Sequence, residues 1–153
     1  MPDKHVSTYD KMGHEIRRDQ YKHDGILSDK YVVAYDGAGN RTVESHEYKD
    51  GRRTRSSRTV STFDIAGKKT AEMLYLDGNL SHKMTWKYDD KGNLLEDIRY
   101  GPDGSPSEKS TFIYDQFDSY GNWGKATVSE IKKQGKSDFV RTMSMQRRIT
   151  YQE

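Results

Sequence analysis

The sequence predicts an all-β protein: an antiparallel meander of about ten strands, built from two-stranded hairpin repeats. Three observations support this prediction. A turn motif recurs along the chain, the segments between turns alternate in polarity, and no window carries the apolar stripe of a helix. About thirteen residues per strand and turn leave no room for crossover helices. We therefore expect one single-layer or curled sheet.

The first kind of turn is an aromatic residue followed by Asp, two variable residues and Gly. Turns of this kind start at Tyr9, Tyr35, Phe63 and Tyr88, and Tyr114-Asp115 opens the same turn and then departs from it. Successive starts are 26, 28, 25 and 26 residues apart. Asp accepts hydrogen bonds from its own turn backbone, and Gly adopts positive φ without strain. The five starts mark the units of a single repeat domain over residues 1–153.

The second kind of turn places Tyr shortly before an Asp-Gly pair. Its members begin at Tyr21, Tyr48, Tyr75 and Tyr100. Each lies near the middle of a unit, so every unit is expected to be two strands joined by two short turns. Asp-Gly pairs are typical of tight hairpins.

We expect the turn-entry aromatics of both kinds to share one apolar face. Two residues before four of these aromatics come Met73, Trp86, Ile98 and Phe112. The opposite face is expected to be wetter, with Arg58, Thr62 and Asp97 among its residues. Leu, Ile, Val and Phe together number 24 of 153 residues, which predicts a thin core supplemented by cross-strand aromatic and ion pairs.

Composition excludes several classes of function. The absence of Cys excludes disulfides and thiolate chemistry. A formal charge of +2, from 26 basic and 24 acidic residues, gives no reason to expect nucleic-acid binding. No apolar run is long enough to cross a bilayer, so no membrane insertion is expected. We expect a secreted, periplasmic or envelope location if a leader has been removed, and a cytoplasmic one otherwise.

Two of the turns resemble a known repeat. The segments 35–40 (YDGAGN) and 88–93 (YDDKGN), with their flanking strands, resemble the YD repeats of RHS-type proteins, over about residues 7–151. The resemblance implies a small stand-alone bacterial β-sheet array that acts as a shell, scaffold or binding surface, and similar repeats are often labelled carbohydrate-binding. A weaker resemblance is to the MORN-like repeats of some antitoxin-type proteins, whose Gly-Trp spacing is missing here.

The candidate ligand site combines aromatic planes with polar groups. Its residues are Trp86, Tyr114, Asp115, Asp118, Tyr120 and Trp123. Sugar rings stack on aromatic planes beside hydrogen-bonding groups, and an irregular turn in a regular array is a common place for function. We expect an enlarged turn over 115–123. The alternatives are that Tyr114 packs in the core, as its repeat position indicates, and that the enlarged turn is a harmless insertion.

One basic patch stands out, made of Arg52, Arg53, Arg55 and Arg58. These arginines could contact phosphate or an acidic glycan, or they could protect an exposed strand from edge pairing. The turn aspartates are too far apart along the sheet to share a calcium ion, and the histidines lack metal-site spacing, so no metal, cofactor or catalytic residue is predicted.

We therefore predict a non-enzymatic binding or scaffold module of a bacterial envelope or secreted system, which binds a glycan or a protein partner. The alternative is a protein–protein interaction module, such as an immunity, assembly or shell factor of an RHS-type system that acts by strand pairing. Homo-oligomers through edge strands or the aromatic face are a further expectation.

Overall fold

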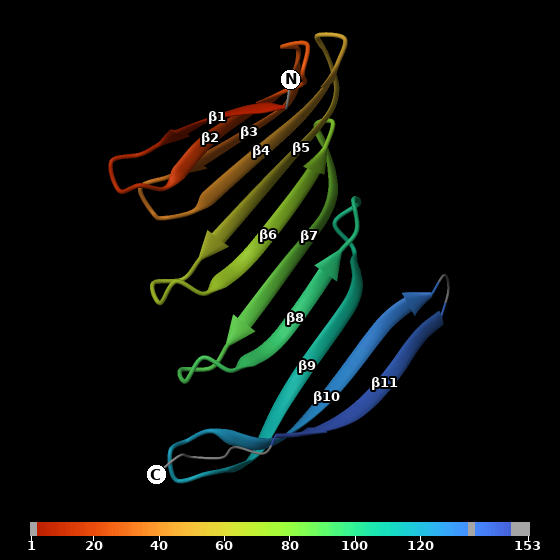
Figure 1. Cartoon of the computed structure of the whole chain (residues 1–153). Coiled ribbons are helices and arrows are strands. Elements are labelled where there is room, and N and C mark those ends of the chain that lie inside the picture. The colour runs from red at the N-terminus through yellow and green to blue at the C-terminus, as the bar shows by residue number, and fades with distance from the viewer. Residues whose placement is uncertain (1–2, 135–136, 148–153) are drawn as a thin grey trace. The chain divides into compact units, whose positions relative to one another are not determined.

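The computed structural model describes residues 3–134 and 137–147 and confirms the all-β antiparallel meander (Figure 1). The strands are β1 (Lys4–Tyr9), β2 (Glu15–Tyr21), β3 (Leu27–Tyr35), β4 (Arg41–Lys49), β5 (Arg52–Phe63), β6 (Lys69–Leu76), β7 (Asn79–Tyr88), β8 (Leu94–Tyr100), β9 (Pro106–Phe117), β10 (Trp123–Gln134) and β11 (Ser137–Gln146). Their order in the sheet follows the sequence from β1 to β11. The predicted repeat span continues past residue 147, and its last residues lie outside the described part of the chain.

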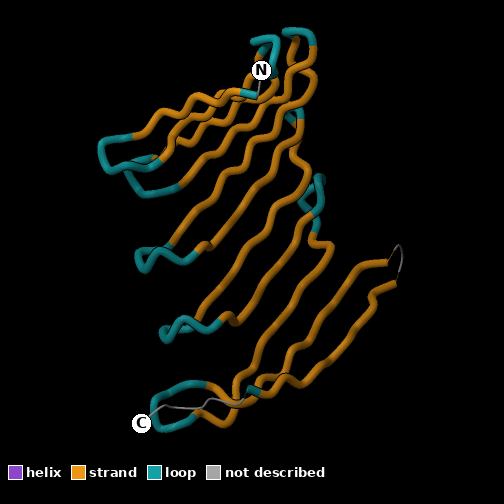
Figure 2. The backbone as a smooth tube through the Cα atoms, in the orientation of Figure 1, coloured by secondary structure: helices purple, strands orange, loops and turns teal. Residues whose placement is uncertain are grey.

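Two units make up the chain: an N-terminal unit of residues 1–83 and a C-terminal unit of residues 84–153, with the boundary inside β7. Within each unit the strands form a single layer, and short turns join them (Figures 1 and 2). Among residues 3–134 and 137–147, no helix has the length and apolar character needed to span a membrane.

The first kind of turn has the predicted chemistry. At 36–40 the backbone N–H of Asp36 donates to the carbonyl of Asn40, and that of Gly39 donates to the carbonyl of Asp36, both at 3.0 Å. Asp36 Oδ1 accepts the backbone N–H groups of Ala38 and Asn40 at 2.9 Å. The hydrogen bond from the Asn40 side chain is the main cause that lowers the pKa of Asp36. Gly39 has φ 80°, which explains the Gly at this position.

The second kind of turn contains two geometries. Asp50-Gly51 and Asp77-Gly78 have positive φ at both residues, as two-residue type I′ hairpins require. By contrast, the segments 22–26 and 101–105 form the same five-residue turn as 36–40. In these two turns the aspartate, Asp24 or Asp103, is the third residue and not the first. Its carboxylate accepts a hydrogen bond from the backbone N–H two residues ahead.

Bulges accompany the turn-entry aromatics. The register shifts at Tyr9, Tyr21, Tyr48, Phe63 and Tyr100. In each case the partner strand has one extra residue, and in four cases this residue is Ser or Thr: Ser28, Thr54, Thr70 and Ser107. Each hydroxyl donates to the carbonyl of the residue before the aromatic, at 3.1–3.3 Å. The bulge therefore belongs to the repeat.

In the N-terminal unit the register defines two faces. Face A carries the row Arg17, Val32, Glu44, Arg58 and Tyr75, and face B carries the row Arg18, Tyr31, Ser45, Ser57 and Leu76. The prediction of one aromatic face is wrong here, because Arg58 pairs with Tyr75 and therefore shares its face. Tyr35 and Phe63, from the first kind of turn, lie on face B. The two kinds of aromatic thus lie on opposite faces. Leu27 pairs with Tyr21 and shares its face, whereas Tyr31 lies on the other face. The bulged residue Ser28 between them causes this change.

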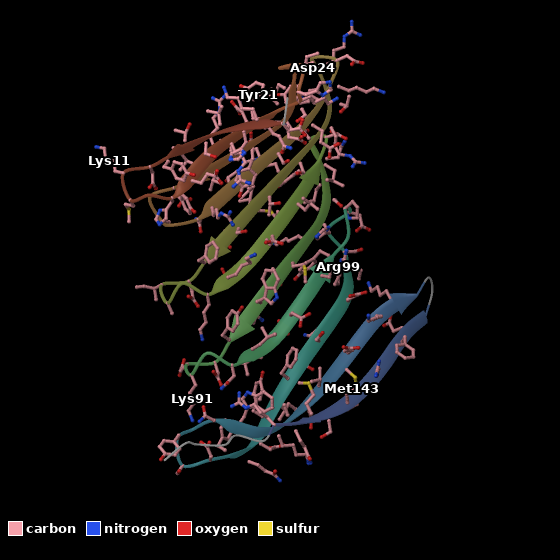
Figure 3. The ribbon with its side chains drawn as sticks, viewed as in Figure 1. Lys11, Tyr21, Asp24, Lys91, Arg99 and Met143 are labelled. Carbon is pink, nitrogen blue, oxygen red and sulfur yellow. The ribbon has the colours of Figure 1, made fainter. Side chains whose placement is uncertain are left out.

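The C-terminal unit shows the same two-sided arrangement. Its face C carries the rows Asp97, Ser110, Glu130 and Arg141, and Phe112, Val128 and Met143. Its face D carries the row Ile98, Lys109, Ile131 and Val140. Ile98 and Phe112 were expected on one face and lie on opposite ones. In both units side chains project from both faces of the strands (Figure 3).

The core is thin, as the composition predicts. Among the described apolar residues, Val33, Ala126 and Val128 are buried. Val128 pairs with Phe112 on one side and with Met143 on the other, so both neighbours in its row are large apolar residues. Stability therefore depends on cross-strand neighbours more than on a second layer.

Candidate binding site: a polar groove on strands β4 to β6

A groove of about 460 Å³ lies in the N-terminal unit. It is lined by Glu44, His46, Arg53, Ser56, Ser57, Arg58, Tyr75, Asp77 and Gly78. The lining residues come from three adjacent strands and the β6–β7 turn, and most of them lie on face A. Such a volume is within the range of small-ligand sites.

Two of the four predicted basic-patch residues line this groove together. Arg53 pairs with Tyr48 and Arg58 pairs with Glu44, and both side chains reach the groove. Arg55 pairs with Glu47 on face B, where its Nη1 is 3.9 Å from the Glu47 carboxylate. Arg52 is exposed at the start of β5. The sequence cluster is therefore divided between the two faces.

The Tyr75 ring forms the apolar wall of the groove. The guanidinium carbon of Arg58 lies 5.8 Å from the centroid of this ring, within the range of a cation–π contact. Glu44 is 3.7 Å from Arg58 Nε and 3.7 Å from His46 Nε2. Both separations exceed ordinary hydrogen-bond lengths, so the Glu44 carboxylate is loosely held.

Hydrogen bonds join Ser56 and Asp77, two of the residues that line the groove. Asp77 Oδ1 accepts the backbone N–H of Ser56 at 2.7 Å, and the backbone N–H of Asp77 donates to the Ser56 carbonyl at 2.9 Å. The Ser56 hydroxyl also contacts Asp77, at 3.3 Å. This carboxylate therefore holds the β6–β7 turn against β5.

The predicted enlarged turn over 115–123 is not found. β9 continues through Asp115 to Phe117, and the turn is the ordinary five-residue form over 118–122. Asp118 Oδ1 accepts the backbone N–H groups of Tyr120 and Asn122 at 2.9 Å. The aromatic-Asp-x-x-Gly motif occurs three residues later than expected, with Phe117 as its aromatic residue.

The structure brings together two of the predicted ligand-site aromatics. The Tyr114 and Trp123 rings lie 5.3 Å apart, and the Arg147 guanidinium is 4.5 Å from the centroid of the Trp123 ring. The Tyr114 hydroxyl donates to the Leu94 carbonyl at 2.8 Å. Regular alternation would place the Tyr114 and Trp123 rings on opposite faces. Gln116, whose φ is 56°, breaks the alternation between them. These contacts occupy both aromatic side chains in packing.

The remaining predicted residues are dispersed. Asp115 is exposed in β9, Tyr120 is 73% exposed in the turn, and Trp86 is half-buried in β7. Beside this turn, Lys91 lies 5.0 Å from the Phe117 ring centroid (Figure 3). In the described part of the chain, no group of three or more His, Asp or Glu side chains is placed to hold a metal ion.

Sequence reasoning missed the groove because it depends on the register. His46, Ser56 and Tyr75 belong to three different strands, and nothing in their spacing joins them. One partial signal was available: Ser28, Thr54, Thr70 and Ser107, the four bulged hydroxyl residues, each come six or seven residues after a turn-entry aromatic. It is not sufficient, because Thr42 follows Tyr35 by seven residues and pairs in regular register.

No family model matches the chain, and no curated protein matches it. A crystal structure of a protein of unknown function from Bacteroides fragilis is similar with TM-score 0.36 and 15% identity, covering 95% of this chain and 91% of that chain. TarM is similar with TM-score 0.22 and 10% identity, covering 82% of this chain and 19% of its own.

Proposed function

We propose that this protein is a non-enzymatic binding module of a bacterial envelope or secreted system, and that the β4–β6 groove binds a carbohydrate. The observation that carries the proposal is the groove itself, where the Tyr75 ring stands beside the polar side chains of His46, Ser56 and Arg58. Carbohydrates need this combination, because the C–H face of a sugar packs on an aromatic plane while its hydroxyls need hydrogen-bonding groups.

The groove carboxylates support binding rather than catalysis. Asp77 is bound to the Ser56 backbone, and Glu44 lies between Arg58 and His46. Asp77 therefore has a structural role, and Glu44 is a loosely held charge of the groove surface. The resemblance of the turns to YD repeats, which are often labelled carbohydrate-binding, agrees with the same proposal.

A glycan array tests it with three variants. Tyr75→Ala removes the groove wall, Tyr35→Ala removes an exposed turn-entry tyrosine from face B, and Trp123→Ala removes the aromatic of the predicted 115–123 site. We expect Tyr75→Ala alone to lose selective binding, with circular dichroism and light scattering confirming that each variant is folded. Binding that survives Tyr75→Ala would overturn the groove assignment.

A second candidate function is protein interaction, and one observation favours it. Face D of the C-terminal unit exposes Ile113, Ile131 and Val140, the first and last by more than 60%. Exposed aliphatic side chains on one face of a sheet are typical of an interaction surface. If this face joins two copies of the chain, light scattering will give a dimeric mass that Ile131→Lys reduces to that of a monomer; a monomeric wild type would remove this candidate.

A further inference from the structure

We infer that the ligand of the groove carries a negatively charged group, which Arg53 and Arg58 bind. The inference rests on the proposed function, because it describes the ligand of that same groove. It adds a chemical class to the ligand: a sugar with a carboxylate, sulfate or phosphate substituent.

Arg53 reaches the groove because of the bulge at Thr54. Tyr48 pairs with Arg53, and Glu47 pairs with Arg55, so Thr54 is an extra residue between the two pairs. Adjacent residues of β4 lie on opposite faces of the sheet, and each residue of β5 lies on the same face as the β4 residue that it pairs with. Arg53 therefore projects on face A, as Arg58 does, with Ser56 between them on that face, and Arg55 projects on face B.

The two carboxylates of the groove do not neutralise its two arginines closely. Asp77 is committed to the Ser56 backbone at 2.7 Å, and Glu44 divides its two oxygens between Arg58 and His46 at 3.7 Å each. Within the described residues, no carboxylate lies within 4.0 Å of Arg53. Among the described residues, the Arg53 guanidinium thus has no carboxylate partner, and the Arg58 guanidinium has only Glu44 at 3.7 Å.

Guanidinium groups are well suited to bind an anionic substituent. A guanidinium presents a planar fork of N–H donors that matches carboxylate, sulfate and phosphate oxygens. The Arg58 guanidinium lies over the Tyr75 ring, 5.8 Å from its centroid, so a sugar ring that contacts Tyr75 brings its anionic substituent within reach of Arg58. Glu44 and Asp77 face the same groove, and their charges disfavour a densely charged polyanion. An isolated anionic group on a sugar fits best.

The test uses three probes of equal length and four forms of the protein. The probes are a hyaluronan hexasaccharide with one carboxylate per disaccharide, a sulfated hexasaccharide, and neutral N-acetylchitohexaose. The proteins are the wild type, Arg53→Gln, Arg58→Gln and the matched control Arg55→Gln, which loses the same charge from the same strand on the opposite face. Calorimetric titration at two salt concentrations gives each affinity.

The expected result is that at least one anionic probe binds more tightly than the neutral probe. Arg53→Gln and Arg58→Gln should each weaken that binding about tenfold, and Arg55→Gln less than about twofold. Which anionic probe binds more tightly distinguishes carboxylate from sulfate. Equal losses in Arg53→Gln and Arg55→Gln would show nonspecific attraction and overturn the inference.

Two other outcomes separate the inference from the proposed function. If the neutral probe binds as tightly as the anionic probes and Arg53→Gln has no effect, the inference is wrong while the groove remains a glycan site. If none of the three probes binds and the glycan array is also blank, both the proposed function and the inference are overturned.

Discussion

Arg53 and Arg55 are two residues apart in β5, yet their side chains lie on opposite faces of the strand. The extra residue Thr54 causes this, because it stands between the pairs Tyr48–Arg53 and Glu47–Arg55. In regular pleating, residues i and i+2 share a face. The bulge therefore divides one run of arginines into a groove residue on face A and a solvent-facing ion pair on face B.

The hydroxyl of Thr54 should stabilise this bulge. Thr54→Val keeps the β-branched shape but loses the bond from Oγ1 to the Glu47 carbonyl at 3.3 Å. We expect a loss of about 0.5–1 kcal/mol in the free energy of unfolding, measured by urea denaturation. Thr59→Val is the control, because Thr59 lies between Val43 and Leu74 on face B. Equal effects from both variants would contradict a special role for the bulge hydroxyl.

Glu96 joins three strands of the C-terminal unit. Its carboxylate is 2.6 Å from Lys109 Nζ and 3.0 Å from Lys87 Nζ, and the hydrogen bond from Lys109 is the main cause that lowers its pKa. Glu96→Gln should cost about 0.5–1 kcal/mol at neutral pH, a modest value because both lysines are partly exposed.

The stabilisation by Glu96 should depend on pH in one direction. Its folded pKa is lowered, so the contribution is present above the ordinary value of 4.5 and is lost as the pH falls through the folded pKa. Glu108→Gln, which breaks the more exposed 3.6 Å pair with Lys132, is the control. If Glu96→Gln costs no more than Glu108→Gln at neutral pH, the three-strand ion pair is not a stabilising element.

Asp97 should behave in the opposite way. Burial is the main cause that raises its pKa, and the nearby charges of Glu130, Glu108 and Glu96 add to it, against the bond from Ser110 Oγ at 3.2 Å. A raised folded pKa means that stability is lost as the pH rises above the ordinary value of 3.8.

Asp97→Asn removes the charge and keeps an oxygen for Ser110. We expect a higher thermal midpoint than wild type at neutral pH, and the difference should shrink as the pH falls below the ordinary value of 3.8, where the aspartate becomes protonated in both states. A lower midpoint for Asp97→Asn at neutral pH would show that the carboxylate charge stabilises the fold.

Trp123 should contribute to folding rather than to ligand binding. Trp123→Ala removes the contacts with Tyr114 and Arg147 and should lower the free energy of unfolding by about 1–3 kcal/mol while leaving groove binding unchanged. Tyr120→Ala, in the adjacent turn, should change stability by less than about 0.5 kcal/mol. A Trp123→Ala variant with full stability but no glycan binding would restore the 115–123 site.

The turns and the strand order could be predicted because their chemistry is local. Asp36 bonds to residues two and four positions ahead, and Gly39 needs positive φ, so the sequence pattern alone is enough. The segment 117–122 has the same pattern, and it was missed because its start departs from the regular repeat interval by three residues.

The faces and the groove could not be predicted, because they depend on the register between strands. Alternation places residues correctly within a strand, but a single bulged residue such as Ser28 or Thr54 changes which face the following residues occupy. Arg58 and Tyr75 come together through such pairing, and their positions in the sequence give no sign of it.

The most direct test of the groove assignment is a map of backbone amide chemical shifts during titration with the hyaluronan hexasaccharide. We predict that the perturbed amides cluster in residues 44–58 and 75–78, and that Arg53→Gln reduces the shifts while Arg55→Gln leaves them unchanged. Perturbations centred on residues 115–123, or spread evenly over both units, would contradict the account.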